Sequence, residues 1–401
     1  MPIYTYLVKD PAGKTITGVI EAPNPSSAGD LLRERRYTVI SLTEKKAGVL
    51  ADILKRFRGV SMREKTMFAR QLATMISAGV PLADALEILR SQTESERMGE
   101  VLAGMLGDIQ GGTSLSKSMA KYPDVFTRVM VALVQAGEAS GKLDQLLSQL
   151  ADHMEKERDF QGKTRGALIY PAIIALAMGA VFLVMIFFVV PSLTDLYTEI
   201  GVELPLMTRI LIGISQLFTG GWIFMLILLG GGGYAFYRYS HSGKGKYQLA
   251  ELAFRFPVFG KLAKESELAR FTRTLGILLG AGVPINQALE TVAAAMGNIL
   301  YRDAILAAGE QVVRGVPLSV PIRADPNFPP LLSQMIAVGE ETGKLDEVLL
   351  KVAVFFENQA EESVKNLSAA LEPLIMIVLG VMVGLLVLSI ITPIYNLTTQ
   401  F

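Results

Sequence analysis

The sequence contains two copies of a glycine- and charge-rich motif that could bind a phosphate group. One copy, starting at Gly137, reads GEASGKLD, and the other, starting at Gly339, reads GEETGKLD. A phosphate-binding loop has four residues between its glycines, then Lys and Ser or Thr, and it follows a strand. Here three residues separate the glycines, leucine follows the lysine and no strand is predicted before either motif. We therefore predict a structural corner between two helices, with no ATP bound there.

The motif residues fit such a corner. Gly141 would break the helix, and Asp144 would lie in the first turn of the next helix, where a negative charge is favourable. Gly343 and Asp346 would do the same in the second motif. Either a buried hydrogen bond or a contact with a partner protein would explain the motif glutamates, Glu138 and Glu340.

Other catalytic and metal-binding patterns do not occur. The chain has no cysteine, which excludes disulfides, thiolate metal sites and cysteine nucleophiles. Its two histidines, His153 and His241, are far apart and are predicted to be ordinary surface or interface residues. No catalytic Ser/His/Asp set, zinc motif or acid pair at defined spacing is found. We therefore predict no enzyme, no catalytic residue, no cofactor and no metal, and the net charge of zero implies no nucleic-acid surface.

An internal repeat runs through the chain. The stretches 68–87 and 271–290 are 203 positions apart and share half of their residues, whereas chance gives about one match in twenty. From the GExxGKLD motifs onward the offset is 202, and at this offset Pro171 pairs with Pro373. Each copy therefore contains a helical domain and the apolar stretch that follows it.

Each copy is predicted to be a compact bundle of about six helices. Apolar residues recur every three to four positions from Phe68 to Ile76, as in a helix with one buried face. Gly79 would end that helix and Pro81 would open the next one. The repeat-matched residues predicted to keep the fold or to contact a partner are Arg70, Gly79, Pro81, Glu138, Gly141, Asp144, Pro171, Arg273, Gly282, Pro284, Glu340, Gly343, Asp346 and Pro373.

The composition indicates a membrane protein. Hydrophobic residues make up 51% and charged residues only 19%, against about 25% charged in a typical soluble domain. A membrane helix needs about 20 apolar residues. Such stretches predict transmembrane helices at 166–192, 218–238 and 372–395. The middle span lies outside the repeat, and it would return the chain so that both copies face the same side.

Lysines and arginines beside the spans predict the orientation. They cluster before the first span and after the second, whereas the segment 193–217 between these spans holds only Arg209 and the tail 396–401 holds none. We therefore predict helical domains in the cytoplasm at 61–165 and 239–371 and a C-terminus in the periplasm. No secretory signal opens the sequence, so the N-terminus is expected in the cytoplasm.

The first 45 residues have a different pattern. Strands are predicted at 4–8, 16–21 and 38–42, with a helix at 27–36, which together form a small α+β module at 1–45. A basic linker, 46–60, follows. The predicted fold is thus an all-α membrane protein with two homologous helical-bundle domains, three transmembrane helices and this N-terminal module.

The quoted motifs resemble the inner-membrane platform proteins of type IV pilus and type II secretion machines. The resemblance covers nearly the whole chain and rests on RQLATMISAGVPLADALE, the two GExxGKLD corners, GALIYPAIIAL, ELPLMTRILI and LEPLIMIVLG. FPPLLSQMIAVGEETGKLDEVL and the LEPLIMIVLG span are more similar to the pilus branch, while the secretion branch remains the alternative. A transporter subunit is favoured less, because the three spans hold no ionisable residue in their interiors, and Glu372 and Arg238 lie only at span edges.

The resemblance implies a scaffold in the bacterial inner membrane. Its cytoplasmic domains would engage a hexameric assembly ATPase, and in some systems a retraction ATPase. Its membrane helices would hand pilin or pseudopilin subunits from the lipid bilayer to the fibre. Other inner-membrane assembly proteins and further copies of the chain are the remaining expected partners.

Overall fold

The computed structural model describes residues 3–9, 15–22, 25–34, 37–44, 59–192, 209, 213, 222–255 and 259–399. The chain forms two units, Met1–Ser61 and Met62–Phe401. The predicted linker 46–60 and the predicted periplasmic segment 193–217 lie almost entirely outside the described residues.

The first unit is a small sheet with one helix. Strand β1 (Ile3–Lys9) pairs antiparallel with β2 (Thr15–Glu21) on one side and β3 (Thr38–Glu44) on the other. Helix α1 (Pro25–Glu34) contacts β3. Ala28 and Leu32, one helical turn apart on α1, are both buried, which gives the helix an apolar face.

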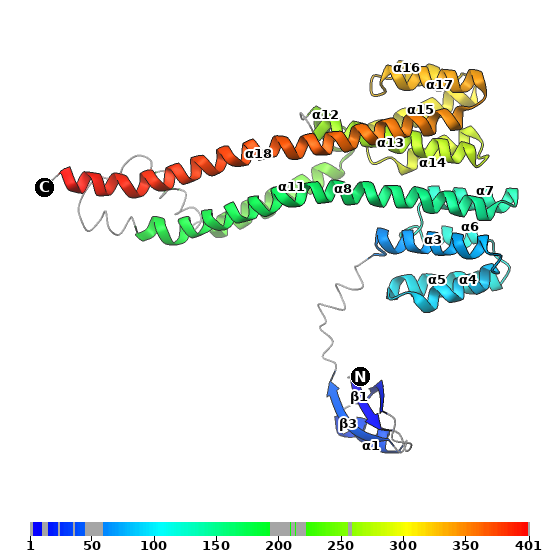
Figure 1. The fold of residues 1–401 in the computed structure, drawn as a ribbon, viewed down its shortest axis with the longest axis horizontal. Coiled ribbons are helices and arrows are strands. Elements are labelled where there is room, and N and C mark those ends of the chain that lie inside the picture. The colour runs from blue at the N-terminus through cyan, green and yellow to red at the C-terminus, as the bar shows by residue number, and fades with distance from the viewer. Residues whose placement is uncertain are drawn as a thin grey trace. The chain divides into compact units, whose positions relative to one another are not determined.

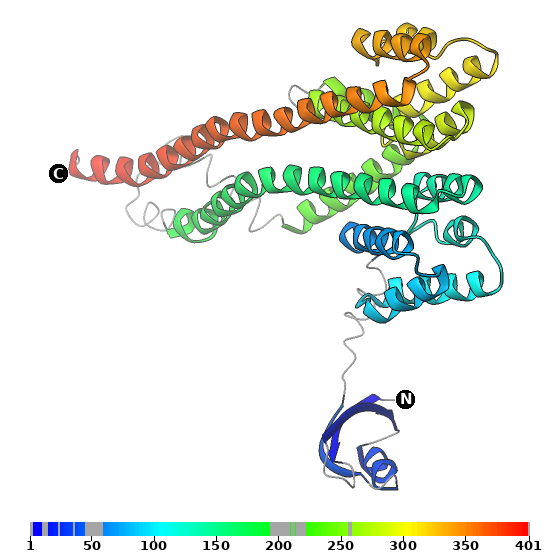
Figure 2. The same ribbon diagram turned by 45° about the vertical axis from the view of Figure 1, so that its right-hand side comes forward.

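The second unit contains the two copies, each with six helices among its described residues, as predicted (Figures 1 and 2). Copy 1 consists of α3 (Met62–Ser77), α4 (Leu82–Gln92), α5 (Glu96–Gln110), α6 (Leu115–Ala120), α7 (Arg128–Ser140) and α8 (Leu143–Val184). Copy 2 consists of α13 (Phe259–Gly280), α14 (Ile285–Ala295), α15 (Ile299–Val313), α16 (Ser319–Ala324), α17 (Pro330–Thr342) and α18 (Leu345–Thr399).

The cores of the two copies use matching residues. Phe68 of α3 packs against Phe126 with ring centroids 5.5 Å apart, and Phe271 packs against Phe328 at 5.7 Å. The first members of these pairs are 203 positions apart and the second members are 202 apart. The one-residue change in the repeat offset therefore falls before Phe126 and Phe328, in the connection that leads to α7 and α17.

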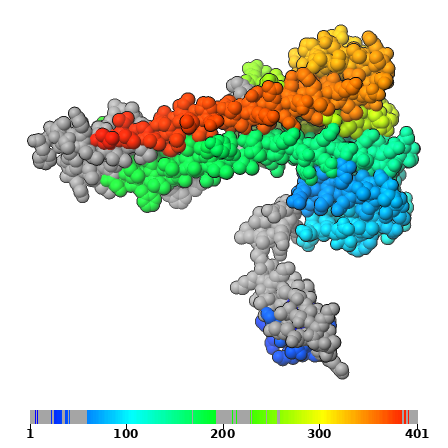
Figure 3. Space-filling model, viewed as in Figure 1, coloured from blue at the N-terminus to red at the C-terminus, as the bar shows by residue number. Residues whose placement is uncertain are grey.

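The last helix of each copy is long and continuous. Helix α8 runs on through a π-helical turn, η1 (Met185–Val189), to residue 192, and α18 spans 55 residues. The predicted boundary between domain and span, at residue 165, thus lies inside one helix. Helices α8 and α18 pack side by side, which the space-filling view in Figure 3 also shows.

Two helices in the described part of the chain are long and apolar enough to cross a membrane, Leu143–Ser192 and Leu345–Gly384. The first contains the predicted span 166–192, and the second covers residues 372–384 of the predicted span 372–395. Between the copies lie α11 (Trp222–His241) and α12 (Gly243–Arg255). Helix α11 covers most of the predicted middle span and ends three residues beyond its predicted end, Arg238.

Candidate functional site

Each GExxGKLD motif forms a sharp corner between two helices. Gly141 follows α7 with a φ of 69°, and Gly343 follows α17 with a φ of 67°. This left-handed conformation is one that glycine adopts without a steric penalty. At the first corner the N–H of Lys142 donates to the carbonyl of Gly137 at 3.0 Å, and the second corner has the same bond. A helix, not a strand, therefore precedes each motif lysine.

The first glycine of each motif has a different role, which the sequence did not suggest. A Cβ atom at Gly137 would lie 3.1 Å from the Cα of Leu143. At Gly339 it would lie 2.9 Å from the Cα of Leu345. The two helices meet so closely that the corner has no room for a larger residue.

The other repeat-matched turn residues also lie at helix ends. The residues that end the first helix of each copy or directly precede the second are Gly79, Gly282, Pro81 and Pro284. Both of these glycines have positive φ values, of 81° and 79°. Asp144 and Asp346 lie in the first turns of α8 and α18, where we expected them.

Glu138 of α7 accepts hydrogen bonds at the beginning of the short helix α6. The N–H of Leu115 donates to its Oε1 at 2.5 Å, and the N–H and the hydroxyl of Ser116 donate to Oε2. These are backbone donors that a helix N-terminus leaves without helical partners, and a negative charge is favourable there. The carboxylate thus ties α6 to α7.

Glu340 repeats this arrangement in copy 2. The N–H of Leu318 donates to Oε1 at 2.5 Å, and the hydroxyl of Ser319 donates to Oε2 at 2.6 Å. The sequence left open a hydrogen bond within the protein or a contact with a partner for these glutamates. In both copies the structure shows hydrogen bonds within the protein.

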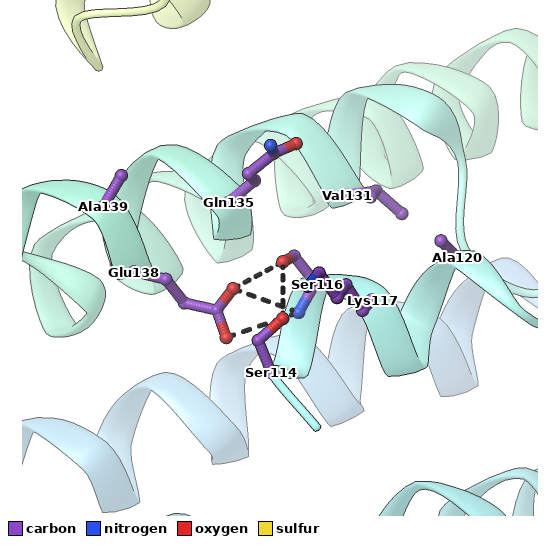
Figure 4. A pocket seen from close by; sticks show the side chains of 8 residues that line it. All are labelled: Ser114, Ser116, Lys117, Ala120, Val131, Gln135, Glu138 and Ala139. Carbon is purple, nitrogen blue, oxygen red and sulfur yellow. Dashed lines mark hydrogen bonds between the residues drawn. The ribbon is translucent and has the colours of Figure 1, made fainter. Parts of the chain in front are cut away.

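A shallow hollow of about 400 Å³ lies beside Glu138, between α6 and α7 (Figure 4). Its lining residues are Ser114, Ser116, Lys117, Ala120, Val131, Gln135, Glu138 and Ala139. The Glu138 carboxylate points toward the serines at the start of α6, as Figure 4 shows, so its oxygens are occupied by the protein's own donors. Lys117 and Gln135 remain as the other polar groups of the hollow.

Arg70 and Arg273 each connect the first helix of a copy to its last helix. Arg70 donates from Nε and Nη2 to the two oxygens of Glu155, both at 2.7 Å, and it also contacts Asp152. Arg273 makes the same two-pronged contact with Glu357, at 2.7 and 2.5 Å. Such paired bonds fix the orientation of both side chains. The hydrogen bond from Arg70 holds the pKa of Glu155 below its usual value.

These acidic partners were missed in the sequence, although Glu155 and Glu357 are identical residues 202 positions apart. Extending the repeat comparison along the last helix would have found them. The two arginines differ in exposure, because the side chain of Arg70 is 36% exposed and that of Arg273 only 9%.

The proline pair lies inside the long helices. Proline has no N–H, so Pro171 leaves the carbonyl of Ala167 without its usual helical donor. The hydroxyl of Ser368 on α18 lies 3.2 Å from that oxygen and 3.2 Å from the carbonyl of Val364, and it is shared between them. Pro373 has the matching place in α18. A contact between the copies thus compensates for the donor that Pro171 lacks.

Charged groups also link the two copies. Lys163 on α8 contacts Glu361 on α18 at 2.5 Å, and Arg270 on α13 lies 3.6 Å from Glu157 on α8. His153 on α8 is half-buried, and burial lowers its pKa below the usual value. Helix α7 contacts α13 and α14, so copy 1 uses both of its last two helices in this contact.

No group of three or more potential metal ligands of the His, Cys, Asp or Glu type occurs within the described ranges. Apart from the two prolines inside the long helices, the repeat-matched residues of each copy form helix ends, helix caps and ion pairs.

A family model described as "Type II secretion system (T2SS), protein F" matches residues 68–191 and 271–393. The chain belongs to this family. The two matched stretches coincide with the two copies and leave out α11 and α12. A second model, for the N-terminal domain of type II secretion system protein F, matches residues 1–43.

Proteins of type IV pilus assembly and of type II secretion both align with nearly the whole of this chain. The type IV pilus assembly protein PilC of Thermus thermophilus is 38% identical over 99% of this chain and 98% of its own length. The type IV pilus assembly protein TapC of Aeromonas hydrophila is 33% identical over 96% and 93%. The type II secretion system protein F of Xanthomonas campestris is 34% identical over 99% of both chains.

Proposed function

We propose that this protein is the inner-membrane platform of a type IV pilus assembly machine. The observation that carries the proposal is the full-length match to pilus assembly proteins, with 38% identity to the Thermus thermophilus relative. The duplicated helical domain, each copy with its own long apolar helix, is what a scaffold needs to connect the cytoplasm to the membrane. The helix corners and caps of each copy support a structural role without catalysis.

The alternative is the platform of a type II secretion system, which the 34% identity to the Xanthomonas campestris protein supports. Deletion of the gene separates the two. A pilus platform predicts that surface fibres disappear while pilin still accumulates in the membrane and export of folded proteins continues. Normal fibres together with lost export would transfer the assignment to secretion. Loss of neither would refute both.

We propose that cytoplasmic ATPases act on the two helical domains and that pilin subunits enter the fibre beside the long helices. The continuous helices α8 and α18 support this, because a rigid helix transmits a displacement from its cytoplasmic end to its membrane end. The matched residues at corners and ion pairs would keep each copy rigid for this purpose. Purified ATPase should bind membranes that contain the chain and not membranes from the deletion strain.

We further propose three membrane spans, 166–192, 218–238 and 372–395, with the N-terminus in the cytoplasm and the C-terminus in the periplasm. The helical domains 61–165 and 239–371 would then both face the cytoplasm, the module 1–45 and the linker 46–60 would share that side, and 193–217 and 396–401 would lie in the periplasm. The exposed apolar side chains of α8 and α18, such as Leu176 and Met376, support the outer two spans.

Fusions of a reporter that is active only in the periplasm would test this topology. A reporter after Phe401 should be active, and one placed near Lys261 should be inactive. Activity at Lys261 would refute the middle span as the return crossing, whatever the machine in which the protein works.

A further inference from the structure

The contact between the two copies joins two different faces. Copy 1 contributes α7 and α8, whereas copy 2 contributes α13, α14 and α18. Each copy has both kinds of face, because the copies share one fold. A contact between unlike faces therefore leaves one face unused on copy 1 and a face of the other kind unused on copy 2. In copy 2 the unused face includes α17, which packs on α16 and α18 and makes no extensive contact outside its own copy in the described part of the chain.

Burial of matching residues locates this unused face. Val129 on α7 is 5% exposed, and its equivalent on α17, Leu331, is 38% exposed. Ala136 on α7 is half-buried, and its equivalent, Val338, is 44% exposed. These positions lie about two helical turns apart on one side of the helix. The side of α17 that carries these two residues is therefore more open than the matching side of α7, the helix that contacts α13 and α14 of copy 2.

The last helix extends the same face. His153 on α8 lies against copy 2, near Arg270, Arg273 and Glu357. Its equivalent on α18 is Phe355, which is 42% exposed. We call Leu331, Val338 and Phe355 the open face of copy 2. Copy 2 therefore has an exposed phenyl ring at the position where copy 1 has a histidine that lies against the other copy.

Copy 1 has an open face of the complementary kind. Arg270 on α13 contacts copy 1, and its equivalent on α3 is Met67, which is 50% exposed. Thr291 is half-buried on α14, which contacts α7, and its equivalent on α4 is Ile88, which is 40% exposed. We call Met67 and Ile88, together with Asp159 of α8, the open face of copy 1.

We propose that the open face of copy 2 binds the open face of copy 1 on a second molecule of this protein. The contact between molecules repeats the contact that already joins the two copies inside one molecule. It is head-to-tail, so it adds chains one after another into a ring or a helical array, and it does not close as a symmetric dimer.

Charge complementarity supports the same pairing. Inside the molecule Lys163 of copy 1 contacts Glu361 of copy 2. Shifted by the repeat offset of 202, these positions become Lys365 and Asp159, which are again a cation and an acid. Both are exposed, and Lys365 has no ion-pair partner among the described residues. An ion pair between Lys365 of one molecule and Asp159 of the next would therefore repeat the ion pair that joins the two copies inside one molecule.

One internal contact is not repeated. Ser368, whose hydroxyl reaches the carbonyl of Ala167, has Gly166 as its equivalent, which has no hydroxyl. The contact between molecules is therefore expected to be weaker than the contact inside the molecule along the last helices.

Cross-linking of the full-length chain in membranes tests the proposal, because the natural sequence has no cysteine. One differently tagged version carries Lys365→Cys and the other carries Asp159→Cys. A short bismaleimide should join the two versions into a mixed dimer, since an ion pair separates the backbones further than a disulfide allows. Neither version alone should form a dimer with itself.

Two controls make the result decisive. Lys163→Cys with Glu361→Cys in one chain should link internally, which peptide mass spectrometry detects. Arg314→Cys, an exposed site on the loop after α15, replaces Lys365→Cys in the mismatched pair. No mixed dimer despite the internal link, or equal yields from matched and mismatched pairs, would overturn the proposal. Dimers from a single version alone would also overturn it, since they indicate a symmetric contact.

Charge reversal gives an independent measurement on the purified protein. Lys365→Glu should reduce the fraction of larger species at least about twofold, measured by light scattering in detergent. Adding Asp159→Lys to the same chain should restore it. A single reversal without effect, or a double variant no better than the single one, would contradict the ion pair. Gene deletion tests the platform function separately, so a failure of self-association would not count against that function.

Discussion

The carboxylates of Glu138 and Glu340 each stabilise a helix that is too short to be stable alone. Helices α6 and α16 have six residues each, and helix formation in water is unfavourable at that length. Each carboxylate supplies charged acceptors to the first N–H groups and to a serine hydroxyl. The glutamate of the motif therefore matters for its charge as well as for its shape.

Replacing Glu340 with glutamine tests this directly. Glu340→Gln keeps an acceptor oxygen but loses the charge, so the free energy of unfolding should fall by about 1–2 kcal/mol. The measurement is the thermal midpoint of the purified full-length protein in detergent. Glu341→Gln, at the exposed neighbouring residue, should change the stability by less than about 0.5 kcal/mol. Equal shifts in the two variants would mean that the hydrogen bonds contribute nothing specific.

The packing of two neighbouring helices in each copy depends on how closely their backbones can approach each other. Helices α17 and α18 meet at Gly339, where a Cβ atom would lie 2.9 Å from the backbone of Leu345. Gly309 in α15 is a glycine of the opposite kind, because its nearest neighbour, Leu289, would lie at an ordinary contact distance of 3.7 Å. The same substitution should therefore act in opposite directions at the two sites.

Gly339→Ala should destabilise the protein by about 1–3 kcal/mol, because the two helices must move apart. Gly309→Ala should stabilise it by up to about 1 kcal/mol, because alanine is the better helix former. Thermal unfolding followed by circular dichroism gives both values. Destabilisation by both substitutions would show that the close approach at Gly339 is not what distinguishes them.

At the scale of the whole molecule, the two copies meet across a partly charged interface. His153 of α8 faces Glu157 on its own helix and Arg270, Arg273 and Glu357 from α13 and α18. Burial lowers its pKa in the folded protein, so the neutral ring is favoured at the interface. Protonation therefore opposes the contact between the copies.

This predicts a loss of stability in mild acid. The contribution of His153 is fully present above its unfolded pKa of about 6.5 and is lost as the pH falls through the lower folded value. His153→Gln should reduce the fall in melting temperature between pH 8 and pH 5. His241→Gln, at the exposed histidine, should leave that fall unchanged. If both variants behave like the natural protein, the interface histidine does not titrate in this range.

Local patterns in the sequence determined the duplicated unit, the order of its helices and the residues that end them. Gly141 and Gly79 have the predicted roles because left-handed backbone is a local preference of glycine. The long apolar stretches were equally readable, because their length and composition alone indicate a membrane helix.

Only the tertiary structure decided which residues meet. Glu138 bonds a backbone N–H 23 residues away, Arg70 pairs with an acid 85 residues away, and Ala167 meets a hydroxyl 201 residues away. The repeat could align these residues between copies, but it could not show which of them are in contact. Such contacts depend on how helices pack in three dimensions, and the periodicity of a single helix contains no information about the face of its neighbour.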